Sequence, residues 1–235
     1  FFEPEPIHPL DAIMDAYSAT RQQKIVGSST ICLASIDNQT LTFSNIGDCG
    51  LMVLRHFDSE TAGSYMRKRN LPRHLRKNDL RIVFLSQQQL KAFNYPYQLG
   101  YSELPVHAGT FESPTDATTF SLPISPGDII LMATDGLFDN IDIDDIVNLI
   151  SEWETSNYGT VHVNRTLSAE KESEALQQLC SNLVGKAREL SLDDSRDSPF
   201  ALLAKDNDIM WSGGMPDDTS VIVARVAEKV TVSSE

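Results

Sequence analysis

Residues 127–141 set the strongest constraint on the fold, because an apolar run leads directly into an acidic turn. Residues 129–132 form an uninterrupted apolar run with the length of a short buried strand. Thr134, Asp135 and Gly136 follow at once, and glycine permits a sharp turn. The segment therefore predicts a central strand that ends by holding a carboxylate at the edge of a sheet.

Several shorter segments also have the pattern of strands. Residues 28–36 and 40–47 flank the turn residues 37–39, which predicts a hairpin. Residues 51–55 predict a third strand soon after it, so we expect an antiparallel meander rather than alternating strand–helix units. A last strand is predicted at residues 220–226.

Apolar residues recur at helical spacing in three other stretches. They predict helices at residues 9–23, 141–153 and 169–190. Ser198 and Pro199 have the pattern of a helix start, with serine as the capping residue and proline in the first turn. Asp139 is expected to begin the helix that follows it rather than to bind metal. Strands that pair with their neighbours, together with long helices, indicate an α+β domain.

Two stretches lack such periodicity. Residues 93–100 are aromatic and interrupted by proline, which predicts an ordered loop. Residues 56–90 show no regular pattern and contain the basic run at residues 66–81. We therefore interpret this range as an insertion.

The net charge, the lengths of the apolar runs and the number of cysteines argue against some classes of function. A net charge of −14 argues against general nucleic-acid binding. No apolar run reaches the roughly 18–20 residues that a membrane span needs. The three cysteines are widely spaced, so we expect reduced thiols and no disulfide.

The basic charge is concentrated in residues 66–81, which hold seven Lys or Arg and one Asp. One interpretation is a solvated insertion. The other is a docking segment for RNA, an acidic protein or a lipid surface. Its candidate residues are Arg67, Lys68, Arg69, Arg73, Arg76, Lys77 and Arg81.

Four acids lie at the ends of predicted strands. Asp135 follows one strand, Asp217 and Asp218 precede another, and Asp48 occupies a turn between two. Carboxylates brought to one sheet edge repel each other unless a cation lies between them. Oxygen ligands favour Mg²⁺ or Mn²⁺. Each acid taken alone is better explained by an ordinary turn than by a metal site, and only the four together favour a metal site.

The order of four motifs resembles that in metal-dependent protein phosphatases of the 2C type. They occupy residues 27–30, 44–50, 127–140 and 213–220. Residues 93–99 and 198–201 resemble the branch of this family found in mitochondria and plastids, which implies a mitochondrial location, with a plastid or the cytosol as alternatives. The resemblance covers residues 10–226.

The resemblance implies a four-layer α-β-β-α sandwich with two antiparallel sheets. It also implies two Mg²⁺ or Mn²⁺ ions that activate water for hydrolysis of phosphoserine or phosphothreonine in proteins. Asp135 and Asp217 would be metal ligands, and Asp48 would help to hold a weak third ion. Asp218, Asn140 and Gly136 would orient these ligands.

One motif of the family has no counterpart, because Asp-Gly occurs in this chain only at Asp135–Gly136. The family's first metal ligand lies in an earlier Asp-Gly. We therefore expect residues 1–227 to be a phosphatase 2C-like domain whose first strands lie upstream, with a basic insertion at about 56–90 and a polar tail at 228–235.

Two functional hypotheses follow from the missing motif. The first is an active serine/threonine phosphatase, conditional on an upstream Asp-Gly motif. The second is an inactive pseudophosphatase that serves as a binding or assembly module in a larger complex, such as an organellar complex that contains RNA.

Overall fold

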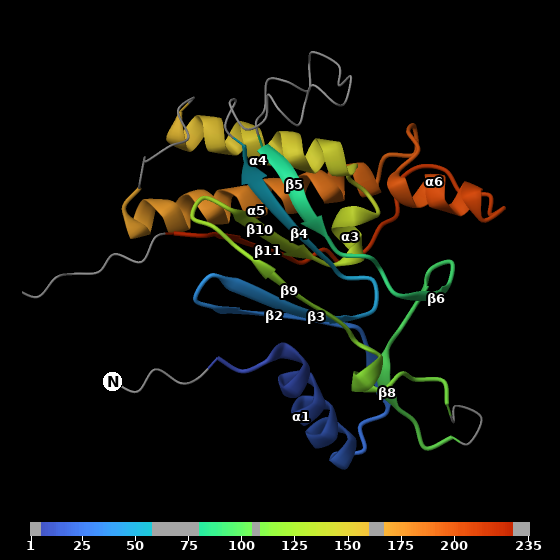
Figure 1. The fold of residues 1–235 in the computed structure, drawn as a ribbon. Coiled ribbons are helices and arrows are strands. Elements are labelled where there is room, and N and C mark those ends of the chain that lie inside the picture. Colours follow the sequence, from blue (N-terminus) through green and yellow to red (C-terminus); the bar gives the residue numbers. More distant parts are fainter. Residues whose placement is uncertain (1–5, 58–79, 105–108, 160–166, 228–235) are drawn as a thin grey trace, which may run out of the picture. The chain divides into compact units, whose positions relative to one another are not determined.

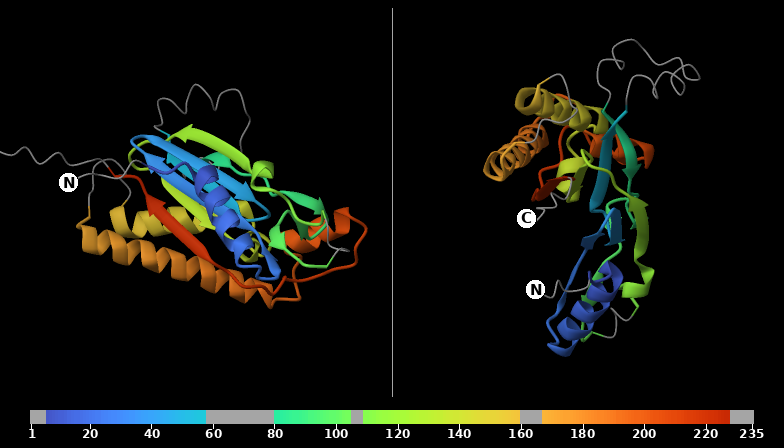
Figure 2. Two further views of the ribbon diagram at one scale, coloured as in Figure 1. Left: turned by 90° about the horizontal axis from the view of Figure 1, so that it is seen from below. Right: turned by 60° about the vertical axis from the view of Figure 1, so that its left-hand side comes forward.

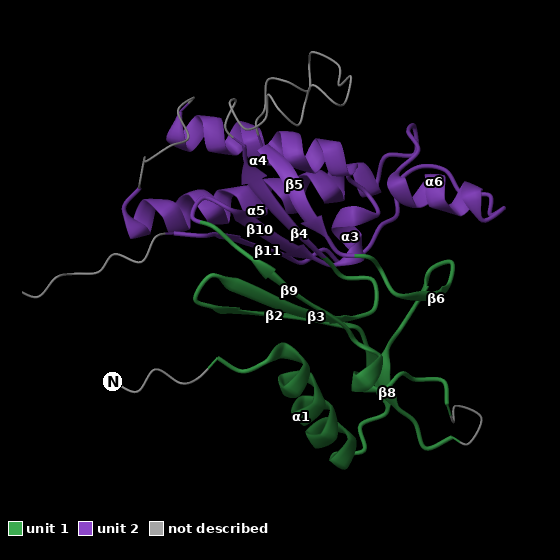
Figure 3. Cartoon of the chain, viewed as in Figure 1, with its two compact units in different colours: residues 1–50, 87–125 green, residues 51–86, 126–235 purple. Residues whose placement is uncertain are grey.

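The structure, a computed structural model, describes residues 6–57, 80–104, 109–159 and 167–227. The chain folds into two compact units, each assembled from two stretches of sequence (Figure 3). Unit 1 comprises residues 1–50 and 87–125, and unit 2 comprises residues 51–86 and 126–235. The chain therefore leaves unit 1 after the first fifty residues, returns to it once, and ends in unit 2.

Unit 1 contains a three-stranded antiparallel sheet in the order β2-β3-β9, with a helix packed against β2 and β3 (Figure 2). Phe43 of β3 and Ile13 of the helix are fully buried and form part of the core. The elements of unit 1 are α1 (Pro9–Gln22), β1 (Gly27–Ser29), β2 (Ile31–Asp37), β3 (Thr40–Ile46), β6 (Leu90–Ala92), β7 (Tyr95–Pro96), β8 (Leu99–Tyr101), the 3₁₀ turn η3 (Pro114–Asp116) and β9 (Thr118–Pro123).

Unit 2 contains a four-stranded sheet in the order β11-β10-β4-β5, and two long helices cover one of its faces (Figure 1). Leu131 of the sheet and Leu183 of a covering helix belong to one buried apolar cluster. The elements of unit 2 are β4 (Gly50–His56), β5 (Leu80–Leu85), β10 (Ile129–Ala133), α3 (Asp135–Phe138), α4 (Ile143–Tyr158), α5 (Ala169–Ser191), α6 (Pro199–Asp206) and β11 (Val221–Arg225).

A partly buried ion pair joins two neighbouring strands of the unit 2 sheet. The guanidinium of Arg55 in β4 donates two hydrogen bonds to the carboxylate of Asp128, both at 2.7 Å. Asp128 lies just before β10, and its side chain is only 1% exposed. The hydrogen bond that Arg55 donates to this carboxylate raises the pKa of Arg55. Since a buried carboxylate needs such a partner, the pair fixes the start of β10 beside β4.

The α+β class and the antiparallel strand pairing expected from the sequence are confirmed. The hairpin of β2 and β3 pairs Ile31 with Ile46 and Asp37 with Thr40. The apolar run of residues 129–132 becomes β10, which lies between β11 and β4 as a central strand. The serine cap of α6 is also present, because the Ser198 hydroxyl accepts the amide N–H of Ala201 at 3.1 Å. The four-layer packing of the two sheets stays a prediction.

The meander prediction is wrong at its third strand. Residues 51–55 do form a strand, but β4 joins the sheet of unit 2 instead of pairing with β3. The connection turns at Gly47, where φ is +117° and an added Cβ would lie 2.4 Å from Thr30 Cγ2. Only glycine fits this backbone and this space. The chain can therefore leave one sheet and enter another within a few residues.

Asp139 does not begin the next helix, contrary to the prediction. It ends α3, and its amide N–H donates to the carbonyl oxygen of Asp135 at 2.8 Å. The residue that caps α4 is Asp142, which has an extended backbone conformation. The short helix α3 cannot be predicted from the sequence, because it spans a single turn and is too short to show apolar periodicity.

Residues 93–100 are more regular than the loop prediction suggested. Tyr95–Pro96 pairs with β6 as β7, and Leu99–Tyr101 pairs with β1 as β8. Strand β5 likewise lies in the range where no element was expected. Strands β7 and β8 escape sequence patterns because two or three residues carry almost no alternation. Strand β5 has six residues, so its length does not explain why no strand was expected there.

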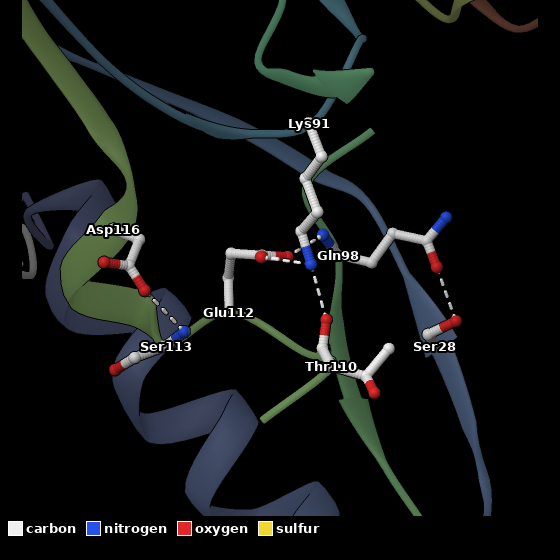
Figure 4. Close-up of polar contacts among 7 residues, drawn as sticks. All are labelled: Ser28, Lys91, Gln98, Thr110, Glu112, Ser113 and Asp116. Atoms are coloured by element: carbon white, nitrogen blue, oxygen red, sulfur yellow. Dashed lines mark hydrogen bonds and ion pairs between the residues drawn. The ribbon is translucent and has the colours of Figure 1, made fainter. Parts of the chain in front are cut away.

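Charged and polar side chains hold this part of unit 1 together (Figure 4). The Gln98 amide N–H donates to Glu112 Oε2 at 2.7 Å, and Glu112 Oε1 lies 2.5 Å from Lys91 Nζ. The Ser28 hydroxyl donates to Gln98 Oε1, which connects β1 to the same network. The hydrogen bond to Glu112 raises the pKa of Lys91. These contacts therefore add side-chain connections to the backbone pairing of the short strands.

Replacing Gly185 with alanine is expected to raise the free energy of unfolding by about 0.5–1 kcal/mol. Gly185 lies inside α5, is exposed, and has no atom within 4 Å of an added Cβ. Alanine restricts the unfolded chain and meets no obstacle in the helix. Urea unfolding of the two proteins measures the difference.

Gly127 provides a matched contrast. An added Cβ would also find open space there, but φ is +92°. Gly127→Ala is therefore expected to lower the free energy of unfolding by about 1 kcal/mol. Equal effects at Gly185 and Gly127 would contradict the role assigned to backbone conformation.

Candidate metal centre

The Asp135 turn begins where β10 ends. Asp135 is the first residue of α3, and its Oδ1 accepts the amide N–H of Gly136 at 2.9 Å. A Cβ on Gly136 would lie 2.6 Å from the carbonyl oxygen of Asp218 and 2.7 Å from Thr219 Oγ1. Glycine is therefore required here because the backbone of a second acidic turn passes directly against it.

That second turn leads into β11. Asp217 is exposed, and its Oδ1 accepts the amide N–H of Asp218 at 2.7 Å. Thr134 connects the two turns: its hydroxyl donates to the carbonyl oxygen of Asp218 at 3.2 Å. The same hydroxyl accepts the amide N–H of Ser220 at 3.0 Å. Since β10 and β11 pair up to Ala133 and Val221, both turns lie at one end of this strand pair.

Asn140 is a further connection between the turns, and it is 1% exposed. Its Nδ2 donates to the carbonyl oxygens of Gly136 at 3.0 Å and Met215 at 2.8 Å. Its Oδ1 accepts the amide N–H of Met215 at 2.8 Å. One buried amide therefore uses both its donor hydrogens and its acceptor to hold the Asp135 turn against the segment before Asp217.

A third contact fixes the base of the Asp217 loop. The amide N–H of Gly214 donates to the carbonyl oxygen of Asp193 at 2.9 Å. A Cβ on Gly214 would lie 2.2 Å from the carbonyl oxygen of Leu190. Because this obstacle is backbone, a larger residue would have to push the loop away from the end of α5.

Asp48 belongs to unit 1, and the structure does not define its distance from Asp135 and Asp217. It lies in the turn between β3 and β4 and is 8% exposed. Its carbonyl oxygen accepts a hydrogen bond from Gln88 Nε2 at 3.2 Å. The convergence of all three acids therefore stays a prediction.

The structure thus brings together most of the acidic site predicted from sequence, namely Asp135, Gly136, Asn140, Asp217 and Asp218. The missed residues are Thr134 and Met215, whose hydrogen bonds join the two turns. The sequence carries no direct signal for Met215, because only its backbone takes part. Thr134 immediately precedes an Asp-Gly pair at the end of a predicted strand, and this position is the sequence signal by which it could have been predicted as part of the site.

The donor set suits a hard divalent cation but is incomplete. Asp135 and Asp217 supply the carboxylate oxygens that Mg²⁺ and Mn²⁺ prefer. Within the described ranges, no group of three or more His, Cys, Asp or Glu side chains is arranged to hold a metal ion. The described residues therefore fit part of a metal site and need further ligands.

The cysteines are free thiols, as expected. Burial, with a smaller contribution from Cys49, raises the pKa of Cys32 to about 12. Burial also raises the pKa of Cys180. The raised pKa values make Cys32 and Cys180 poor nucleophiles at neutral pH.

Most of the predicted docking segment lies outside the described residues. This holds for Arg67, Lys68, Arg69, Arg73, Arg76 and Lys77. Arg81 is described: it lies in β5, and its guanidinium carbon is 5.8 Å from the centre of the Phe57 ring. Among the helices of the described chain, none has both the length and the apolar character required for a membrane span.

Comparison with known proteins connects the chain to protein phosphatases, although no protein-family model matches it. It is 33% identical over 229 residues to the protein phosphatase PTC7 homolog fig of Drosophila virilis, covering 94% of this chain and 61% of that protein. It is 31% identical over 228 residues to the human protein phosphatase PTC7 homolog, covering 95% of this chain and 62% of that protein. The chain thus spans about three fifths of the length of these relatives.

A solved structure supports the same assignment. The X-ray structure of the photosystem II phosphatase PBCP matches with a TM-score of 0.63 and 25% identity, covering 93% of this chain and 70% of that one. Its fold agrees with the α+β architecture and antiparallel sheets described above. Together with the ordered acidic motifs, these similarities show that the chain belongs to the 2C-type family of metal-dependent protein phosphatases.

Proposed function

We propose that this chain is the phosphatase portion of a protein that hydrolyses phosphoserine and phosphothreonine in other proteins with the help of divalent cations. The observation that carries the proposal is the pair of carboxylates, Asp135 and Asp217, on adjacent turns joined by Thr134 and Asn140. An arrangement of two tightly supported acidic turns in a member of this family suits a metal-assisted hydrolase.

In this proposal Asp135 and Asp217 hold two Mg²⁺ or Mn²⁺ ions, and Asp48 contributes to a weak third site. Cations bound there lower the pKa of water and offset the negative charge of a phosphate ester. The protein itself orients the carboxylates: Gly136 and Asp218 each fix one carboxylate oxygen through an amide N–H. Such support keeps the ligands in one geometry before the substrate binds.

The exposure of Asp217 is compatible with a protein substrate, which must bring its phosphorylated side chain to the surface of the enzyme. Two carboxylates are nevertheless too few to satisfy two cations that each take about six ligands. The proposed activity therefore depends on further oxygen donors beyond those described, including the bridging acid of the family's first motif.

The test of the function is phosphate release from a phosphothreonine peptide by the full-length protein. With Mn²⁺ we expect turnover, and with excess EDTA we expect release to fall to the background rate, because the nucleophile is then lost. Re-adding Mn²⁺ should restore the rate, which controls for denaturation. Turnover that persists in EDTA would contradict a metal-dependent phosphatase.

A binding module without activity is the alternative function. It is favoured by one observation: in the described part of the chain, no group of three or more His, Cys, Asp or Glu side chains is arranged to hold a metal ion. A folded protein that shows no turnover and no increase in melting temperature with Mn²⁺ would support it. If the protein does bind the cation, a free cation concentration of about 100 times the Kd would stabilise the native state by about 2.7 kcal/mol.

The partners and location of the protein are also proposals. A phosphoprotein is the proposed substrate, and residues 66–81 are proposed to dock a protein or RNA partner because of their net charge of +6. A mitochondrial location rests on the resemblance of residues 93–99 and 198–201 to that branch of the family. Cell fractionation of the full-length protein tests the location, and recovery outside mitochondria would contradict it.

A further inference from the structure

Five large apolar side chains of unit 2 lie on the surface of α6 and the loop that follows it. We refer to them as the α6 apolar surface: Leu202 is 49% exposed, Leu203 40%, Ile209 39%, Met210 100% and Trp211 39%. The opposite side of α6 already contributes buried residues to the core, among them Phe200 and Ala204. A helix at the surface of a protein normally turns a polar side to water, but in α6 the exposed residues include Leu202 and Leu203 beside the polar Lys205 and Asp206.

The loop after α6 forms an open groove of about 530 Å³. Its lining residues are Lys205, Asp208, Ile209, Met210, Trp211 and Ser212. The indole of Trp211 packs edge-on against the ring of Phe200, with ring centres 5.4 Å apart. Its N–H donates to the carbonyl oxygen of Gly214 at 3.3 Å. Trp211 therefore presents a fixed aromatic wall, a feature typical of binding surfaces.

The α6 apolar surface adjoins the acidic turns of the candidate metal centre. The amide N–H of Phe200 at the start of α6 donates to the carbonyl oxygen of Asp139 at 3.0 Å, and Asp139 ends the short helix that Asp135 begins. In Figure 1, α6 lies beside α3 within unit 2. Trp211 is bonded to Gly214, which precedes Asp217 in the same loop. A peptide that reaches the carboxylates can therefore also reach this surface.

The surroundings of the groove carry excess negative charge. Residues 193–218 contain seven Asp and two basic residues, a net charge of −5. Both basic side chains are already paired within unit 2: Arg196 lies 2.6 Å from Asp142, and Lys205 pairs with Asp197. The exposed acid Asp208 lines the groove, and Asp206, also exposed, is the last residue of α6. A ligand with positive charge would therefore be attracted here.

We propose that the α6 apolar surface binds the part of a phosphoprotein substrate next to its phosphorylated residue, and that this part carries basic side chains beside a large apolar one. The inference rests on the proposed phosphatase function and adds a substrate class to it. The same acidic surroundings disfavour nucleic acid and anionic lipid as occupants. They also disfavour a second copy of this chain, which would bring like charges together.

The experiment compares three phosphothreonine peptides with p-nitrophenyl phosphate in the presence of Mn²⁺. The first peptide has arginine and leucine next to the phosphothreonine, the second replaces arginine with glutamate, and the third replaces leucine with serine. We expect the first peptide to have a KM about tenfold lower than the others, a difference that loss of one buried apolar contact or ion pair can produce. Its advantage should shrink at high salt, which screens surface charges.

Two variants locate the binding surface. Met210→Ser should raise the KM of the arginine-leucine peptide about fivefold, with an unchanged rate on p-nitrophenyl phosphate, because Met210 is fully exposed. Asp208→Asn should reduce the advantage of arginine, and asparagine tolerates the φ of +58° found at this position. The matched controls are Met14→Ser and Asp15→Asn, both exposed residues of α1, which should leave all KM values unchanged.

The two proposals can fail separately. Turnover of p-nitrophenyl phosphate with equal KM values for the three peptides would overturn the inference and leave the phosphatase function intact. If no substrate is turned over, peptide binding is measured directly by the fluorescence of Trp211, which is exposed whereas Trp153 is 5% exposed. Peptide binding that is lost in Met210→Ser would then support the α6 apolar surface as a binding site in a protein without phosphatase activity. A dimer in sedimentation that Met210→Ser dissociates would overturn the inference in favour of self-association.

Discussion

Asp217→Asn and Asp135→Asn are each expected to lower kcat/KM on a phosphothreonine peptide by at least about 100-fold. A neutral amide oxygen is a weaker ligand for Mg²⁺ or Mn²⁺ than a carboxylate oxygen, and loss of a mere outer partner of a metal ligand already costs about 10- to 100-fold. The fold should survive the change at Asp217, because the amide oxygen of an asparagine side chain can still accept the N–H of Asp218. Steady-state kinetics with saturating Mn²⁺ measure the effect.

Asp15→Asn serves as the control for these variants, because Asp15 is an exposed acid of α1 in unit 1. Its activity should equal that of the unmodified protein. If Asp217→Asn kept full Mn²⁺-dependent turnover, the assignment of Asp217 as a ligand would be wrong. An unchanged unfolding curve is needed alongside, so that lost activity can be attributed to chemistry and not to misfolding.

Asn140→Ala is expected to lower the free energy of unfolding by about 3 kcal/mol and to reduce activity as well. The change removes the partners of two carbonyl oxygens and one amide N–H, in Gly136 and Met215. Each buried polar group left without a partner costs about 1–3 kcal/mol, and some relaxation will reduce the sum. Urea unfolding gives the stability, and the midpoint should fall with an unchanged slope.

Two further variants separate hydrogen bonding from shape at this position. Asn140→Asp keeps the shape but replaces Nδ2 with a carboxylate oxygen that faces the carbonyl oxygens of Gly136 and Met215, so it should destabilise at least as much as alanine. Asn207→Ala removes an exposed asparagine whose Nδ2 bonds only the carbonyl oxygen of Leu203 within its own helix end, and it should change stability by no more than about 0.5 kcal/mol. Equal effects at Asn140 and Asn207 would contradict the proposed connection between the turns.

Local patterns predicted the elements whose signals are contained in their own residues. The apolar run of β10 identified a central strand because both faces of such a strand are buried. Ser198 and Pro199 identified the start of α6 because capping involves only neighbouring residues. The acidic turns were found for the same reason, since an acid beside glycine at a strand end is visible in the sequence.

Pairing partners were harder to predict because periodicity shows which side of a strand is buried but not which strand lies beside it. This explains the error at residues 51–55, which have the pattern of a strand but join β10 and β5 instead of β3. It also explains why the contacts of Asn140 with Met215 could not be derived from spacing. These residues are 75 positions apart, and only the packing of β10 against β11 brings them together.

The interrupted course of unit 2 has a consequence for its biosynthesis. Strand β4 lies between β10 and β5 in the sheet, but residues 87–125, which belong to unit 1, are made before β10 appears. Met52 and Leu54 of β4, both fully buried in the finished unit, remain uncovered until the helices follow. At about 5–20 residues per second, the ribosome needs roughly 7–28 s to proceed from the end of β5 at Leu85 to the end of β11 at Arg225. During this interval the apolar surface of β4 is exposed in the nascent chain. Exposed apolar surface promotes aggregation, so we expect chaperones to bind this part of the chain during synthesis.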